Sequence, residues 1–224
     1  MYKNKFKPKC IFLDLDGTIV DSRQAYIEAA KNGFQAIGQY QPEMKVVLEI
    51  PKRIEQGLDL DDLICGDLVK FKTVYLQSYH AFTEEKTKLL PNVSETIEVL
   101  SLKTKLALLT MRHIPNQVVV KELNNLGIGK YFSSVMTAFD TVQPKPSPEA
   151  IFKCIEKFGV ELCDCLIVGD SVNDVRAGKA AGINTIGLLS GLYFYEELEK
   201  ECPDMILSDL TELPKVMSFD YTII

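Results

Sequence analysis

Short apolar runs alternate with longer amphipathic segments along the chain. Runs that predict β-strands lie at residues 10–15, 105–109, 135–136, 166–168, 184–187 and 205–207. In the second half of the chain, connections of about 25 to 30 residues join the runs, and each connection holds one helical pattern. This order predicts an α/β fold with a Rossmann-like, doubly wound parallel sheet.

The first two predicted strands are roughly 90 residues apart, and the sequence between them has helical periodicity. Two apolar stripes lie in this segment, and the second is rich in aromatic rings. They consist of Tyr26, Ala30, Phe34 and Ile37, and of Leu68, Phe71, Tyr75, Tyr79 and Phe82. We therefore predict a small α-helical cap domain over residues 21–89, inserted into a core domain of residues 1–20 and 90–224. The rings fit either the core between the cap helices or the lining of a ligand pocket.

Charge composition narrows the choice of partners. The 224 residues include 25 basic and 31 acidic side chains, which give a formal net charge of −6. Proteins bind nucleic acid largely by neutralising its backbone phosphates, so a chain of this sign is not expected to bind it.

Cysteine usage and hydropathy bear on the compartment. The six cysteines contain no C-x2-C pair and only two histidines accompany them, which favours reduced thiols over disulfides or a zinc site. The apolar run at residues 10–13 is too short for a secretory signal peptide. No stretch approaches the length of a membrane-spanning helix. We expect a cytoplasmic protein that does not bind membranes and that is a monomer or a homodimer.

Reactive side chains gather where the predicted strands end. In an open α/β sheet, the ligand site lies beyond the carboxyl ends of the strands. Four such ends carry Asp14, Asp16, Gly17 and Thr18, then Thr110, then Lys145, and then Asp170, Ser171 and Asp174. Each residue alone also fits a structural role, such as Ser171 capping the next helix or Lys145 lying in solvent. Their placement after consecutive strands favours a shared site.

The first of these ends carries two carboxylates. Asp14 and Asp16 are two positions apart, so extended backbone would place both on one face of the strand. A carboxylate can attack a phosphoryl group and form an acyl phosphate, which water then hydrolyses. Attack by one anion on another requires neutralising charge, and oxygen ligands from Asp14 and Asp170 suit Mg²⁺.

The neighbouring residues would bind the phosphoryl group. Lys145 and the Thr110 hydroxyl are expected to hold its oxygens. Gly17 permits a sharp turn whose backbone N–H groups can point at an anion, so we expect Gly17 and Thr18 to contact the substrate.

In order and spacing, these residues resemble the four motifs of the haloacid dehalogenase (HAD) superfamily. The segment Asp14-Leu-Asp16-Gly-Thr18 is similar to the first motif, Thr110 to the second, Lys145 to the third and residues 169–174 to the fourth. The helical insertion after the first motif resembles the type-1 cap of the phosphoglycolate phosphatase-like branch.

The resemblance implies a role for each acidic residue. Asp14 would be the nucleophile, and Asp16 would protonate the leaving group and then deprotonate the attacking water. Mg²⁺ would be bound by Asp14, by the backbone carbonyl of Asp16 and by Asp170, with Asp174 orienting these ligands. The dehalogenases of the superfamily lack the second acid, so the presence of Asp16 favours phosphoryl transfer.

Two features bear on the substrate. Related phosphatases often have Asn and Lys after the second-motif hydroxyl, whereas this chain has Met111 and Arg112. Arg112 would donate to a second anionic group of the substrate, or lie in solvent. In the cap, a turn formed by Pro51, Lys52 and Arg53 would present Arg53 to a carboxylate or second phosphate, or leave a solvated pair. The apolar Met111 weighs against transferring the phosphoglycolate assignment.

We predict a Mg²⁺-dependent phosphatase that acts on a small phosphorylated metabolite through an aspartyl phosphate on Asp14. A sugar-phosphate mutase would use the same Asp14 and Asp16 but would transfer the phosphoryl group to a second hydroxyl. A phosphonate hydrolase would need a Schiff-base lysine in the cap, and no lysine there identifies itself. A non-catalytic receiver-type or phosphoryl-binding protein is disfavoured by the large insertion and by the intact acidic set.

Overall fold

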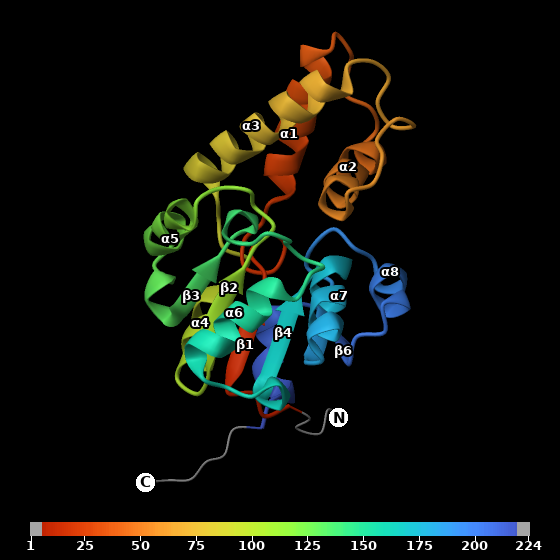
Figure 1. The fold of residues 1–224 in the computed structure, drawn as a ribbon. Helices are drawn as coiled ribbons and strands as arrows, with labels where there is room; N and C mark the ends of the chain where they lie inside the picture. The colour runs from red at the N-terminus through yellow and green to blue at the C-terminus, as the bar shows by residue number, and fades with distance from the viewer. Residues whose placement is uncertain (1–5, 219–224) are drawn as a thin grey trace. The chain divides into compact units, whose positions relative to one another are not determined.

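The computed structural model describes residues 6–218, which form two compact units (Figure 1). The core unit joins the amino-terminal segment through Val20 to the chain from Leu89 onward, and the helical unit is the continuous segment Asp21–Lys88. Val20 and Leu89 pair in an antiparallel bridge, so the chain leaves and re-enters the core unit at one place.

A six-stranded parallel sheet forms the centre of the core unit, which confirms the predicted α/β class. The strand order is β3-β2-β1-β4-β5-β6. The strands are β1 Cys10–Leu13, β2 Lys105–Leu109, β3 Phe132–Met136, β4 Cys165–Gly169, β5 Asn184–Leu188 and β6 Met205–Leu207. Because helices cover both faces, the central strands are apolar at consecutive positions rather than at alternate ones.

Side chains of β1 enter two separate cores. Ile11 and Leu13 pack in one apolar cluster, while Cys10 and Phe12 pack in another, as the two-residue period of a strand requires. The helices of this unit are α4 Val93–Ser101, α5 Asn116–Asn125, α6 Glu149–Phe158, α7 Val172–Ala181, α8 Tyr195–Lys200 and α9 Leu213–Val216. Short 3-10 helices lie at Gly129–Tyr131, Ala138–Asp140, Leu162–Asp164 and Leu210–Glu212.

Strand register determines which residues meet at the carboxyl edge of the sheet. Leu13 pairs with Leu108 of β2 and with Val168 of β4. Strands β2 and β4 continue for one more residue than β1, so Asp14, Thr110 and Asp170 all follow strand ends at the same edge of the sheet. Asp14 directly follows β1, and its N–H donates to the Val168 carbonyl at 3.1 Å, which extends the ladder by one residue.

The helical unit contains α1 Arg23–Ala36, α2 Met44–Gln56 and α3 Leu68–Lys86. Its aromatic stripe forms a core of its own. Phe34 packs edge-on against Phe71 with ring centroids 4.9 Å apart, and Tyr26 stacks on Tyr79 at 5.2 Å. Of the two alternatives, these rings therefore form the core between the helices of this unit, and no ligand is needed to bury them.

The predicted turn at Pro51 is wrong, because Pro51, Lys52 and Arg53 lie inside α2. A proline within a helix removes one backbone hydrogen bond and costs about 3 kcal/mol. In α2 the buried Val47 and Ile50 favour helix across this position, and Pro51 is buried with them. Packing therefore outweighs the local preference of proline.

Two further findings concern the chain as a whole. Among residues 6–218, no helix combines the length and the apolarity that crossing a bilayer requires. All six cysteines carry free thiols, in agreement with the expectation of reduced side chains.

Gly178 of α7 lies against the sheet, and a Cβ there would come within 2.4 Å of Ile167 and 2.5 Å of Thr185. Alanine usually stabilises a helix relative to glycine by about 1 kcal/mol. We expect the opposite sign for Gly178→Ala, a loss of about 1–3 kcal/mol, because the helix must move away from the sheet. Urea unfolding measures this change, with Lys179→Ala at the exposed next position as a control. A more stable Gly178→Ala protein would contradict this packing.

Candidate active site

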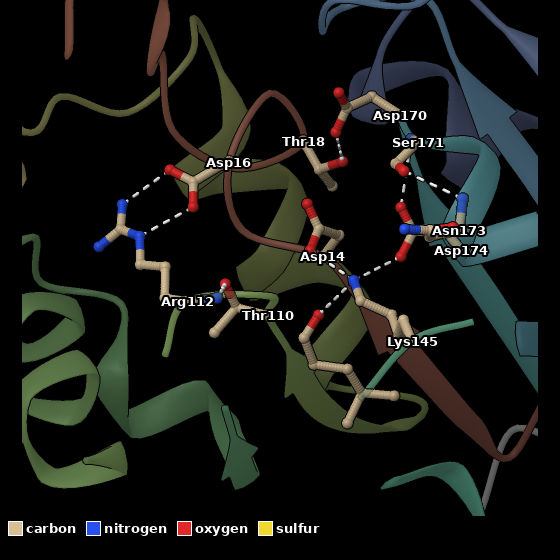
Figure 2. Close-up of polar contacts among 11 residues, drawn as sticks. Asp14, Asp16, Thr18, Thr110, Arg112, Lys145, Asp170, Ser171, Asn173 and Asp174 are labelled. Carbon is tan, nitrogen blue, oxygen red and sulfur yellow. Dashed lines mark hydrogen bonds and ion pairs between the residues drawn. The ribbon is translucent and has the colours of Figure 1, made fainter. Parts of the chain in front are cut away.

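Lys145 holds two aspartates together at the carboxyl edge of the sheet (Figure 2). Its Nζ donates to Asp14 Oδ1 at 2.7 Å, to Asp174 Oδ1 at 2.6 Å and to the Leu109 carbonyl at 2.8 Å. An ammonium group has three N–H donors, so these bonds use all of them. The three charged side chains are each at least 92% buried. The alternative that Lys145 is solvated is wrong, because the loop after β3 directs it into the core.

Asp174 is shared between this cluster and the start of α7. Its Oδ2 accepts from the Ser171 N–H at 3.2 Å, and Ser171 Oγ accepts from the Asn173 N–H at 3.0 Å. This capping box satisfies donors at the helix start. Ser171 therefore has the structural role that the sequence left open, while Asp174 both caps the helix and binds Lys145.

Asp170 lies beside the turn that follows β1. Thr18 Oγ1 donates to Asp170 Oδ1 at 3.0 Å. Gly17 has φ +83°, and a Cβ there would lie 2.5 Å from Asp170 Oδ2. At Gly191, in the loop after β5, a Cβ would lie 1.6 Å from the same oxygen. Two glycines therefore leave the space that the Asp170 carboxylate occupies.

The charges of this cluster do not balance. Asp14, Asp170 and Asp174 each present a carboxylate oxygen, and these atoms lie within 4.8 Å of one another. Burial raises the pKa of Asp14 to about 8; Lys145 opposes this increase, and Asp174 and Asp16 add to it. Burial lowers the pKa of Lys145, but Asp14 and Asp174 outweigh it and hold that pKa above its usual value. The ammonium of Lys145 therefore stays charged.

Once Asp14 is ionised, three buried carboxylates face one ammonium, which leaves excess negative charge. Carboxylate oxygens are the preferred ligands of small divalent cations. This donor set therefore fits a divalent cation, and the cation would restore the balance of charge around Asp14, Asp170 and Asp174.

Asp16 faces a different partner. Arg112 donates to both of its oxygens, from Nε and from Nη2, each at 2.8 Å. Arg112 Nη1 also donates to Glu122 Oε2 at 2.5 Å. Arg112 is only 4% exposed, so the alternative that it lies in solvent is wrong. Figure 2 shows the pair of Asp16 and Arg112 separate from the cluster around Lys145.

Two other predicted site residues have distinct positions. Thr110 directly follows β2 and is buried; its N–H donates to the Met136 carbonyl at 3.0 Å, and its Oγ1 accepts from the Arg112 N–H at 3.2 Å. Arg53 belongs to the helical unit, where it pairs with Asp62 and with Glu49. The cluster described above therefore consists of residues of the core unit alone.

Three residues of the site escaped the sequence analysis. Gly191 adjoins Asp170, Ser190 Oγ donates to the Gly17 carbonyl at 2.7 Å, and Glu122 binds Arg112. Ser190 and Gly191 follow the fifth strand, so reading that strand end like the other four would have found them. No local pattern singles out Glu122, which lies among other polar residues of α5.

A Rossmann-like sheet with an acidic, lysine-linked site at its carboxyl edge defines an α/β enzyme of the phosphoryl-transfer type. Comparison of the whole sequence with known families identifies the family within this class. The sequence model of the family described as haloacid dehalogenase-like hydrolase matches residues 11–188. The chain therefore belongs to the haloacid dehalogenase-like hydrolase family.

Similar proteins agree with this assignment. The chain is 31% identical to a phosphoglycolate phosphatase of Vibrio parahaemolyticus, over 94% of this chain and 96% of that protein. It is 34% identical to a phosphoglycolate phosphatase of Escherichia coli O157:H7, over 91% and 90%. A crystal structure described as a predicted phosphoglycolate phosphatase from Haemophilus somnus aligns with a TM-score of 0.74 at 26% identity, over 94% and 98% of the two chains. Family and relatives indicate a phosphatase.

We expect Gly191→Ala to weaken Mg²⁺ binding by about 10- to 100-fold, because the added methyl group displaces Asp170. Isothermal titration calorimetry with Mg²⁺ measures the affinity. Gly187→Ala on the preceding strand is a matched control, since its nearest neighbours lie at 3.3 Å and beyond. Unchanged affinity in Gly191→Ala would show that Asp170 is not a ligand.

The raised pKa of Asp14 predicts a pH dependence for the same binding. The folded, cation-free protein keeps this proton up to about pH 8, whereas the ordinary pKa of an aspartate carboxyl is 3.8. The contribution of this proton to the free energy of unfolding is therefore lost as the pH rises from 3.8 to about 8. Because the cation must displace the proton, Mg²⁺ affinity should strengthen by up to about tenfold per pH unit between pH 6 and 8. Calorimetry in buffers of different ionisation enthalpy should detect proton release. An affinity that does not change with pH would contradict the prediction.

Proposed function

We propose that this enzyme is a Mg²⁺-dependent phosphatase that hydrolyses a small phosphate monoester through an aspartyl phosphate on Asp14. The observation that carries the proposal is the position of Asp14: its carboxylate is bound to Lys145 and lies beside Asp170 and Asp174 at the carboxyl edge of the sheet. A carboxylate in such surroundings can attack phosphorus while nearby charges offset the repulsion between anions.

The reaction has two steps. In the first, an oxygen of Asp14 forms a bond to phosphorus, the bond between phosphorus and the ester oxygen breaks, and protonated Asp16 gives its proton to the leaving oxygen. In the second, water attacks the phosphorus of the acyl phosphate while Asp16 accepts a proton from the water. Inorganic phosphate leaves, and the carboxylate of Asp14 is restored.

Lys145 has two roles in this scheme. In the resting arrangement it orients Asp14, and its bond to Asp174 fixes it against the start of α7. When the phosphoryl group enters, one of its three donors can turn from Asp14 to a phosphoryl oxygen, and the buried hydroxyl of Thr110 can donate to another. Both contacts strengthen as negative charge builds on the transferring group.

Asp14 and Asp170 would hold the cation, together with the backbone carbonyl of Asp16 that the family resemblance implies, and Asp174 lies beside them. When bound, Mg²⁺ supplies positive charge that lowers the repulsion between the nucleophile and the phosphoryl oxygens. Both oxygens of Asp174 already accept a hydrogen bond, Oδ1 from Lys145 and Oδ2 from the Ser171 N–H at the start of α7. We therefore assign it to orientation of the ligands more than to direct coordination.

Phosphoglycolate is the first substrate to test, because the relatives named above are phosphoglycolate phosphatases. Its carboxylate needs a cationic partner on the enzyme. In the resting structure Arg112 is already paired with Asp16 and Glu122. Arg53 of the helical unit is the other candidate partner for this carboxylate. It is paired with Asp62, and its side chain is more exposed than that of Arg112.

The test is release of inorganic phosphate from a panel of phosphorylated metabolites, with Mg²⁺ and with a chelator. Asp14→Asn removes the nucleophile but keeps the shape of the side chain, and we expect kcat to fall by at least about 10³-fold. Circular dichroism checks that the variant is folded, and analysis of the organic products detects transfer to a second hydroxyl. Substantial turnover by folded Asp14→Asn would refute the aspartyl phosphate.

A further inference from the structure

Arg112 lies between two carboxylates. Its Nε and Nη2 donate to Asp16, and its Nη1 donates to Glu122, which is ten positions further on in α5. The side chain of Arg112 is 2% exposed, that of Glu122 9% and that of Asp16 12%. This network of three residues is therefore almost shielded from water.

The pairing in this structure keeps Asp16 from acting as an acid. Both carboxylate oxygens of Asp16 accept hydrogen bonds from the guanidinium, so neither is turned toward a leaving group. Asp16 does not belong to the group of three carboxylates, Asp14, Asp170 and Asp174, that could hold a cation. To take up and deliver a proton at the substrate, its side chain must give up at least one bond to Arg112.

Leaving Arg112 without a partner would be costly. Removing one partner of a buried ion pair strongly destabilises a protein, because the other charge stays buried and uncompensated. Glu122 changes this cost, since its carboxylate remains bound to Arg112 after Asp16 has left. Glu122 Oε1 is buried and has no hydrogen-bond partner among the described residues, so it can accept a further N–H from the guanidinium.

We propose that Glu122 is a positioning residue for the catalytic acid: as the permanent counter-ion of Arg112, it allows Asp16 to leave the guanidinium and turn toward the leaving group. This inference rests on the proposed function, in which Asp16 is the general acid and base. Arg112 then serves as the resting partner of Asp16, and Glu122 sets how tightly Asp16 is held. In Glu122→Gln, Asp16 becomes the one carboxylate of this network left to balance Arg112, so the pair should tighten.

The proposal predicts an effect that depends on the leaving group. Esters whose leaving group is a stable anion, such as p-nitrophenyl phosphate, need little help from an acid, whereas alkyl phosphates need protonation. The ratio kcat/KM reports steps up to transfer of the phosphoryl group to the enzyme when that transfer is irreversible. We expect Glu122→Gln to lower kcat/KM for alkyl phosphates about 10- to 100-fold more than for p-nitrophenyl phosphate.

Two variants serve as controls in the same assay. Glu156→Gln makes the same change at an exposed position of α6 and should leave both substrates at wild-type values. Asp16→Asn removes the acid itself and should depress alkyl phosphates selectively. An Asp16→Asn protein without this selectivity would count against the proposed function. Selectivity in Asp16→Asn with equal losses for both substrates in Glu122→Gln would overturn only the role of Glu122.

A double variant keeps the inference testable if Glu122→Gln does not fold. In Arg112→Gln with Glu122→Gln, both buried charges are gone and Asp16 has no guanidinium to leave. The ratio of kcat/KM between alkyl and p-nitrophenyl phosphates should then return to within about threefold of wild type, since Asp16 is free to turn. A ratio as low as that of Asp16→Asn would overturn the proposal.

Discussion

The ammonium of Lys145 is the interaction on which the site depends. It joins the end of β1, the end of β2 and the start of α7 through Asp14, the Leu109 carbonyl and Asp174. The contact with Asp14 spans 131 positions of the sequence, and those with Leu109 and Asp174 span 36 and 29. The register of three neighbouring strands brings these residues together. Without this cation, two buried carboxylates would face each other at the edge of the sheet, an arrangement that folding can sustain only with compensating charge.

The sheet could be read from the sequence because its strands are buried on both faces. Runs such as residues 105–109 and 205–207 were predicted with the bounds that the structure has, since continuous apolar sequence between turn residues leaves few alternatives. The acidic strand ends followed from the same reading, because topology alone places them at one edge. The helix around Pro51 could not be predicted from the local sequence, because packing of buried neighbours within the helical unit stabilises it.

The pairing of Arg112 with Asp16 and Glu122 could not be predicted from the sequence for a different reason. A side chain that follows a strand end has several possible carboxylate partners, and only the packing of α5 brings Glu122 to it. Whether Asp16 faces Asp14 or turns away is likewise a choice of side-chain rotamer, which spacing along the strand does not determine. Spacing predicted that Asp14 and Asp16 leave the strand on one face, but not that their carboxylates bind separate cations.

Both ionic clusters hold more carboxylates than cationic side chains, but the excess has a different consequence in each. Around Lys145, three carboxylates exceed one ammonium, so the cluster favours an added cation. Around Arg112, two carboxylates compete for one guanidinium, so one of them can leave without stranding a buried charge. In the proposed mechanism, Asp14 keeps a fixed position to attack phosphorus, whereas Asp16 moves a proton between two groups. In the cluster around Lys145, the excess of carboxylates favours binding of a cation. In the cluster around Arg112, the second carboxylate allows Asp16 to move.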